Sequence, residues 1–305
     1  MPTIYEGDER GTSYVRPLLC TIRETLTESQ ISDASPSSTP AHLRSPVSEL
    51  KGLKLFRYEL NRHFKRFMRR MCFSALNNRQ FTKCGPRVRL QEALSMDFIA
   101  RNTTIRVPRL LDVFSIRGTV HIIQERIDGP VLEDVWHHLS TEEQHSSMMQ
   151  VKDCLDQLRA LKPQHPERVQ AVDGSGLIDS RLGSGIWGPF NNHSEFHQFL
   201  NHDVLRARSE TYPRVQEALS RVDGKQYKTV FSHGDLGPHN IIWKDGRIVI
   251  IDWERAGWFP EYWDYTRVYA ARGYMKDWWK RFKEVADGYD DELELYIRIS
   301  EYFET

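Results

Sequence analysis

The sequence predicts an α+β fold in which antiparallel β-hairpins and amphipathic helices occupy separate stretches of the chain. Two hairpins are expected, at 107–124 with a turn at 115–118 and at 241–251 with a turn at 244–247, because β-rich runs flank a glycine-containing turn in each. Apolar residues at helical spacing predict helices at 90–100 and 148–161. With 305 residues, 39% of them hydrophobic, the chain can bury a sizeable core and fill two lobes.

The amino-terminal segment, residues 1–48, is expected to be disordered or flexible. Residues 27–46 are dominated by Ser, Thr, Pro and Asp, and they offer few large apolar side chains to offset the entropy of ordering. Between Leu53 and Met71, apolar residues recur at spacings of three and four while Lys and Arg crowd the other faces, which predicts a basic amphipathic helix. Such a helix can lie on an anionic membrane or bind a partner, but its commoner fate is to dock on the domain.

Residues 49–127 are expected to form an amino lobe that includes this helix. The run 80–85 reads as a short strand, and the helix at 90–100 follows it. Lys83 of the strand and Glu92 of the helix are oppositely charged and form the natural ion pair between the two elements. The alternative is that both are solvated surface charges, since Lys and Glu are commonly exposed.

Residues 128–305 are expected to form a larger, mainly helical carboxyl lobe. The sequence from Ser140 to Glu143 resembles a capping box, and the apolar stripe that follows continues until Pro163. The stretch 253–279 is rich in Trp and Tyr. With nearby carboxylates these rings can hold an ammonium-bearing substrate, although large aromatic side chains more commonly pack the core.

The second hairpin places several polar residues close together. Counting outward from a two-residue Asp-Gly turn pairs Asn240 with Ile251 across the hairpin. Asp252 then emerges beside Asn240, and an amide oxygen with a carboxylate suits Mg²⁺. Asp235 lies in the preceding loop, free to accept a proton from an attacking hydroxyl. The alternative is a loop in which Asp235 and Asn240 make only turn hydrogen bonds.

Two motifs resemble those of a known family. They are His-Gly-Asp-Leu-x-Pro-x-Asn at 233–240 and Ile-Asp-Trp-Glu-x-Ala-Gly-Trp-Phe-Pro-Glu-Tyr-Trp-Asp at 251–264. With them the chain resembles the aminoglycoside phosphotransferase/choline kinase-like family, most of all its fungal members, over roughly residues 80–280. The resemblance implies a two-lobed protein-kinase-like fold, with a small mixed amino lobe built on an antiparallel sheet and a larger, mainly helical carboxyl lobe.

The resemblance also implies roles for the residues of the two motifs. The residue that matches the family's catalytic base is Asp235, and those that match its Mg²⁺ ligands are Asn240 and Asp252. His233 and Asp264 match positions that support the catalytic loop, so their loss would impair activity without contact to a substrate.

The amino lobe is expected to hold the nucleotide. By resemblance, Lys83 would contact the α- and β-phosphates of ATP and Glu92 would hold Lys83 in place. The backbone of the hinge at Glu125 and Ile127 would pair with adenine. A Gly-rich phosphate loop should precede Lys83, yet the stretch 71–82 contains no glycine.

These observations predict an ATP- and Mg²⁺-dependent phosphotransferase that moves the γ-phosphoryl group to a hydroxyl of a small molecule. The intact Asp235, Asn240 and Asp252 favour catalysis. The missing glycines favour the alternative of a non-catalytic nucleotide-binding or scaffold protein that retains the fold. The acceptor, which can be cationic, is not specified by the sequence.

Composition narrows the expected partners and location. The 42 basic and 42 acidic residues balance, so no net field favours nucleic acid, and no apolar run is long enough for a membrane span. The four cysteines show neither disulfide nor metal-ligand spacing, and the amino end carries no apolar secretory segment. A reducing, cytoplasmic setting is therefore expected, and nothing indicates an oligomeric state.

Overall fold

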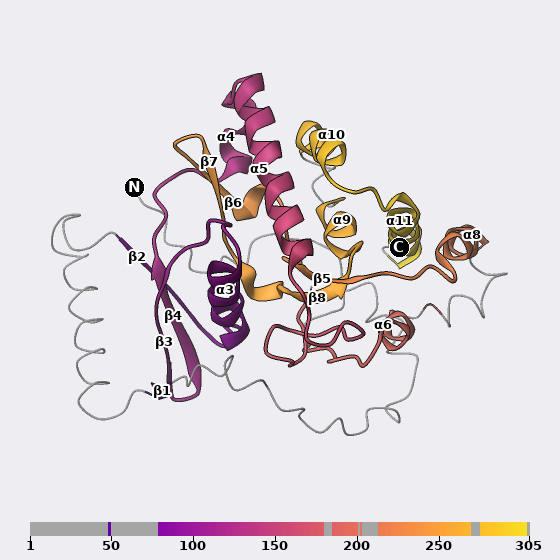
Figure 1. The fold of residues 1–305 in the computed structure, drawn as a ribbon, viewed down its shortest axis with the longest axis horizontal. Helices are drawn as coiled ribbons and strands as arrows, with labels where there is room; N and C mark the ends of the chain where they lie inside the picture. Colours follow the sequence, from indigo (N-terminus) through magenta and orange to yellow (C-terminus); the bar gives the residue numbers. More distant parts are fainter. Residues whose placement is uncertain are drawn as a thin grey trace.

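The computed structural model gives the arrangement of both predicted lobes (Figure 1). The flexible segment predicted for residues 1–48, apart from Ser48, and the basic helix predicted between Leu53 and Met71 lie outside the residues that it describes. These two expectations and the lobe boundaries stay predictions. The described residues are 48–49, 79–179, 185–200, 202, 213–269 and 275–303.

Within the described residues, the amino lobe contains a mostly antiparallel sheet and the long helix α3 (Leu90–Asn102). The strands lie in the order β1-β3-β4-β2. The helix packs against β3 and β4, and its Met96 and Ile99 side chains are buried. The strands are β1 (Ser48–Glu49), β2 (Gln80–Cys84), β3 (Leu110–Ile116) and β4 (Thr119–Glu125).

The hairpin of β3 and β4 forms where it is predicted, but its turn is tighter than the sequence suggests. Arg117 and Gly118 have positive φ angles of 49° and 77°, which is typical of a two-residue turn that matches the twist of the strands. Ser115 and Ile116, expected in the turn, therefore belong to β3 and pair with Val120 and Thr119.

The carboxyl lobe is mainly helical, as predicted (Figure 1). In the part of this lobe that the structure describes, two short antiparallel sheets support the loops: β5 pairs with β8, and β6 with β7. The strands are β5 (Thr229–Ser232), β6 (Ile241–Lys244), β7 (Arg247–Ile250) and β8 (Gly257–Pro260). The helices are α4 (Leu132–Val135), α5 (Thr141–Ala160), α6 (His193–Phe199), α8 (Pro213–Val222), α9 (Trp263–Val268), α10 (Lys276–Val285) and α11 (Asp290–Phe303), with 3₁₀ turns η1 (Trp136–His138), η2 (Pro238–Asn240) and η3 (Trp253–Arg255).

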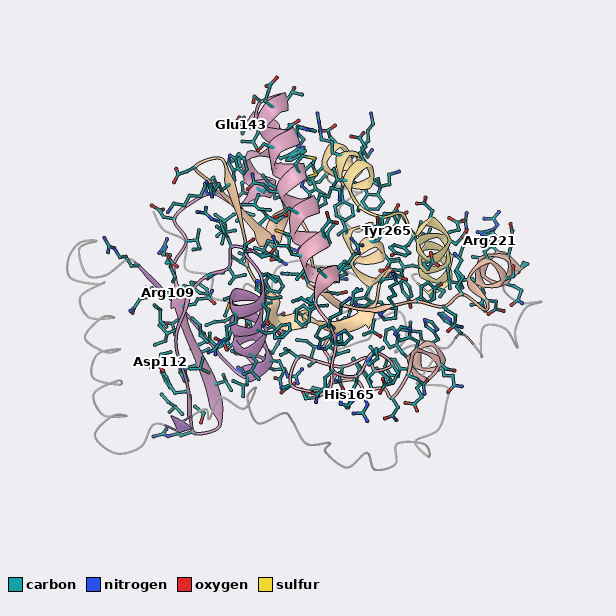
Figure 2. All side chains as sticks on the ribbon, in the orientation of Figure 1. Arg109, Asp112, Glu143, His165, Arg221 and Tyr265 are labelled. Carbon is teal, nitrogen blue, oxygen red and sulfur yellow. The ribbon has the colours of Figure 1, made fainter. Side chains whose placement is uncertain are left out.

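Helix α5 confirms the predicted capping box. The Ser140 side chain accepts a hydrogen bond from the backbone of Glu143, and the Glu143 side chain accepts one from the backbone of Ser140. Glu143 marks this end of the helix in Figure 2. The apolar stripe of α5, including Val151 and Leu158, is buried. The helix ends at Ala160, shortly before a proline that cannot continue it.

The aromatic stretch 253–279 packs inside the protein. Every described Trp and Tyr in it is buried, and Trp253 and Trp278 have no exposed surface. Tyr265, labelled in Figure 2, donates its hydroxyl to Asp290 of α11 at 2.7 Å. The described rings of the stretch therefore serve the core and give no support to an ammonium-binding pocket. None of the helices in the described part of the chain combines the length and hydropathy of a transmembrane span.

Candidate active site

The loop after β5 carries the first motif, and its path requires a glycine. Gly234 has a φ of +77°, and a Cβ at this position would lie 2.4 Å from the carbonyl oxygen of Arg255. Only glycine tolerates both the backbone conformation and the close approach. This contact places the loop directly against η3, so the two sequence motifs meet.

Asp264 holds the backbone of this loop through two hydrogen bonds. Its Oδ2 accepts the backbone N–H of His233 at 3.1 Å, and its Oδ1 accepts that of Gly234 at 2.9 Å. Burial raises the pKa of Asp264, while the charge of His233 and the two amide hydrogen bonds act in the opposite direction. Both carboxylate oxygens are thus used to fix the backbone just before Asp235.

His233 connects the loop to the second hairpin. Its ring is fully buried, and Nδ1 accepts the backbone N–H of Asp235 at 3.2 Å. Its Nε2 lies 3.0 Å from the carbonyl oxygen of Ile251, which can only accept, so the ring proton belongs on Nε2. Burial lowers the pKa of His233 and favours the neutral ring. With both nitrogens engaged, His233 is a scaffold residue.

Asp235 itself lies between two arginines. Its Oδ2 is 2.8 Å from Nη1 of Arg255, and its Oδ1 is 3.0 Å from Nε of Arg267. Burial acts to raise the pKa of Asp235, whereas His239 and the charges of Arg267 and Arg255 lower it, and the result is well below the usual range. The His239 ring nitrogen is 3.7 Å away, beyond hydrogen-bond distance, so we assign the effect to the arginines.

The second hairpin has the predicted register. Its ladder runs outward from Lys244 and Arg247, and the backbone N–H of Ile251 donates to the carbonyl oxygen of Asn240 at 3.0 Å. The Asn240 side chain donates from Nδ2 to the backbone oxygen of Asp235 at 2.9 Å. This bond fixes the amide and leaves its oxygen to accept.

Asp252 follows the hairpin in an uncommon conformation. Its φ of 63° and ψ of 62° lie in the left-handed region, which a non-glycine residue rarely adopts. Such outliers cluster at functional sites, where the surrounding structure holds them in place. The Asp252 side chain remains partly exposed and accepts a hydrogen bond from Lys83.

The predicted ion pair of the amino lobe is present and reaches across to the carboxyl lobe. Lys83 Nζ lies 2.8 Å from Glu92 Oε2, 2.8 Å from Asp252 Oδ1 and 3.3 Å from Glu254 Oε2. Burial acts to lower the pKa of Lys83, but the three carboxylates raise it above its usual value. Burial also raises the pKa of Glu92 to about 7, against the effect of Lys83. One ammonium thus joins both lobes.

The same three carboxylates are the part of the site best suited to a metal ion. One oxygen each from Glu92, Asp252 and Glu254 lies within 4.8 Å of the others, which no other His, Cys, Asp or Glu group among the described residues achieves. Hard oxygen ligands of this kind fit Mg²⁺. The Lys83 ammonium already balances part of their charge, so an added ion would share these carboxylates with it.

The predicted adenine contacts lie at the end of β4. The backbone N–H of Glu125 donates to the carbonyl oxygen of Arg109 at 2.9 Å, so this group is used within the lobe. In the part of the chain that the structure describes, the backbone N–H of Ile127 has no main-chain partner. This state suits an amide that pairs with a ligand. The residues before Lys83 that would carry a phosphate loop lie largely outside the described ranges.

The residues Glu254, Arg255 and Arg267 were not assigned to the site from the sequence, although each contacts one of its charged residues. Glu254 and Arg255 lie inside the second motif, directly after Asp252, so their position was a usable signal. Arg267 lies 32 residues from Asp235, and no pattern connects them. Only the packing of α9 beside the loop brings Arg267 to the carboxylate.

The family models assign this chain clearly. The model described as the phosphotransferase enzyme family matches residues 85–298. This range includes both motifs and begins two residues after Lys83. No curated protein matches the chain.

Several solved structures are similar to this chain at low sequence identity. An aminoglycoside phosphotransferase from Streptomyces rimosus, in complex with ADP and streptomycin, is 16% identical, with 79% of this chain and 97% of that chain covered and a TM-score of 0.44. A choline/ethanolamine kinase family protein from Mesorhizobium loti is 14% identical, with coverage of 72% and 69% and a TM-score of 0.44. A fructosamine-3-kinase-like protein from Thermobifida fusca is 21% identical, with coverage of 72% and 75% and a TM-score of 0.42.

Proposed function

The chain belongs to the phosphotransferase enzyme family, and from that premise we propose that it transfers the γ-phosphoryl group of ATP, with Mg²⁺, to a hydroxyl of a small molecule. The observation that carries the proposal is the meeting of both lobes at Asp252. Lys83 reaches it from the amino lobe at 2.8 Å, and the loop of Asp235 lies against the turn that follows it.

The nucleotide and the metal ion would occupy the side of the site that contains Lys83. The Lys83 ammonium, held by Glu92, would contact the phosphates. The backbone N–H of Ile127 would pair with adenine, and Glu125, whose N–H already donates to Arg109, would contribute its carbonyl oxygen. Asn240 and Asp252 would supply oxygen ligands for Mg²⁺, and the short distance between Asp252 and Glu254 adds a further carboxylate. Bound Mg²⁺ would neutralise charge on the phosphates.

The acceptor would occupy the side that contains Asp235. An ionised carboxylate there can accept the hydroxyl proton as the acceptor oxygen bonds to the γ-phosphorus and the bond to ADP breaks. The low pKa that the arginines impose makes Asp235 a weak base, so its main contribution would be to orient the hydroxyl. Such positioning dominates phosphoryl transfer, whose transition state needs little covalent help.

A screen for phosphorylated products with radiolabelled ATP, Mg²⁺ and a panel of small alcohols tests the proposal. Asp235→Asn should reduce transfer by about 10²–10⁴-fold and leave Mg·ATP binding nearly unchanged, because the residue acts on the acceptor. Asp112→Asn, the same change at an exposed position of β3, is the matched control and should retain full activity. Activity of Asp235→Asn within about tenfold of the unmodified protein would rule out this role.

The same preparation separates catalysis from the scaffold alternative. An enzyme should be stabilised against thermal unfolding by Mg·ATP and should turn it over slowly even with water as acceptor. Stabilisation without turnover across the whole panel would favour a non-catalytic nucleotide-binding protein.

A further inference from the structure

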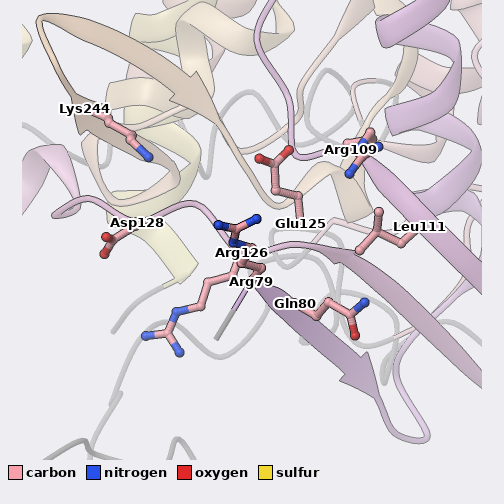
Figure 3. Close-up of a pocket in the computed structure, with 8 residues that line it drawn as sticks. All are labelled: Arg79, Gln80, Arg109, Leu111, Glu125, Arg126, Asp128 and Lys244. Atoms are coloured by element: carbon pink, nitrogen blue, oxygen red, sulfur yellow. The ribbon is translucent and has the colours of Figure 1, made fainter. Parts of the chain in front are cut away.

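A second concave surface lies at the hinge between the lobes, apart from the candidate active site (Figure 3). This cavity has a volume of about 620 Å³, within the range of small-molecule sites. Figure 3 shows that its lining comes from the start of β2, the start of β3, the end of β4 with the segment that follows it, and the end of β6. None of Lys83, Asp235 and Asp252 lines it. It shares Glu125 with the predicted nucleotide contacts, where the backbone and not the side chain is expected to pair with adenine.

Strand geometry separates the cavity from the face that carries Lys83. Side chains alternate between the two faces of a strand, so Gln80 and Lys83, three positions apart on β2, point to opposite faces. Lys83 points toward α3, where it pairs with Glu92. Gln80 lines the cavity, and its partner in the ladder, Glu125, lines it as well. The cavity therefore lies on the outer face of the sheet, behind the hinge.

The lining carries an excess of positive charge. Four cationic side chains and two carboxylates contribute, which leaves a net charge of +2, and the carboxylates belong to Glu125 and Asp128. Arg79, Arg109 and Lys244 form no ion pair with any residue that the structure describes. The fourth cation is Arg126. The three cations without carboxylate partners, Arg79, Arg109 and Lys244, converge on a concave surface and create a positive potential that attracts anions.

We propose that this cavity binds a multivalent phosphate-type anion. Arginine guanidinium groups present paired N–H donors that match phosphate oxygens, and lysine adds a mobile point charge. Arg79 and Arg109 come from the amino lobe, Arg126 from the hinge and Lys244 from the carboxyl lobe. A bound anion would bridge both lobes and stabilise the lobe orientation that brings these cations together. The proposal does not depend on the chemistry of the active site.

Pyrophosphate, titrated calorimetrically into the full-length protein in metal-free, low-salt buffer, is the probe. Arg79→Gln with Arg109→Gln should weaken its binding at least tenfold. Arg101→Gln with Arg221→Gln removes the same charge from exposed positions on α3 and α8 and should leave binding unchanged. All four residues are exposed, so the variants should fold, and equal melting temperatures check this.

The outcomes that would overturn the proposal are distinct. Absence of pyrophosphate binding to the unmodified protein, an equal loss in both double variants, or no loss in either would each remove the cavity as the site. Saturating ADP should leave the binding in place, and displacement by ADP would assign the pyrophosphate to the nucleotide cleft instead. Co-sedimentation with vesicles of phosphatidylcholine and phosphatidic acid, if lost only in the cavity variant, would identify the phosphate as a lipid headgroup; without co-sedimentation, the source is a soluble anion.

Discussion

The two sides of the candidate active site have opposite charge arrangements. On the nucleotide side, three carboxylates surround one ammonium, that of Lys83. On the acceptor side, two guanidinium groups hold one carboxylate, that of Asp235. An excess of carboxylates leaves capacity for a metal ion, whereas an excess of guanidinium groups keeps Asp235 ionised and fixes its orientation. The comparison indicates that the side of Lys83 can accept a further cation, whereas the side of Asp235 keeps that side chain in one orientation.

The largest expected effect concerns the more deeply placed arginine of the acceptor side. Arg267→Met should lower the free energy of unfolding by about 3 kcal/mol or more, because it removes a partner from a mostly buried carboxylate. Arg255→Met is the matched comparison and should cost less, since the Arg255 side chain is more exposed, at 20% against 14%. Urea unfolding measures both. Equal losses would contradict the unequal roles of the two arginines.

A substitution on the nucleotide side should change the affinity for Mg·ATP more than the free energy of unfolding. Asp252→Ala should weaken binding of Mg·ATP by at least the roughly 10–100-fold that loss of an outer-shell partner costs a metal site. Binding of ATP without Mg²⁺ should change little, so the Mg²⁺ dependence itself disappears. Titrations with and without EDTA measure this, with Asp134→Ala, on α4, as the control. A variant that keeps its Mg²⁺ dependence would remove Asp252 as a ligand.

Asp264 should show a smaller effect, which acts through the loop that carries Asp235. Asp264→Asn replaces one acceptor oxygen with an NH₂ group, so one of the amide hydrogen bonds from His233 and Gly234 is lost. The expected cost is about 1.5–3 kcal/mol of unfolding free energy. If the loop positions Asp235 as inferred, phosphoryl transfer should fall more than Mg·ATP affinity. Equal losses in both would show that the loop also serves the nucleotide.

The smallest expected effect is a pH dependence that comes from His233. Burial lowers its pKa in the folded state, so below the unfolded pKa of about 6.5 the unfolded chain binds the extra proton and stability falls. This residue should therefore account for up to about 1.4 kcal/mol of the stability lost per pH unit below pH 6.5. His233→Gln should flatten the stability curve by that amount, and His138→Gln should not. An unchanged curve would mean that the pKa of His233 is the same in the folded and unfolded states.

The sequence by itself determined the local features of this protein. An Asp-Gly turn and two β-rich runs determine the hairpin register, so the place of Asn240 opposite Ile251 could be counted without coordinates. The capping box at Ser140 is likewise a local hydrogen-bond pattern, written within four residues. The Lys83–Glu92 ion pair could be predicted because the two residues belong to consecutive elements, β2 and α3.

Only the tertiary structure decided which distant groups meet. Arg267 reaches Asp235 because α9 packs beside the loop that carries Asp235, and Glu254 joins Lys83 because η3 lies against α3. The same holds for the aromatic stretch, whose rings were compatible with a pocket until their burial showed them in the core. Periodicity and turn chemistry act over a few residues, whereas charge pairing and burial depend on how whole elements pack, and a single sequence does not display that packing.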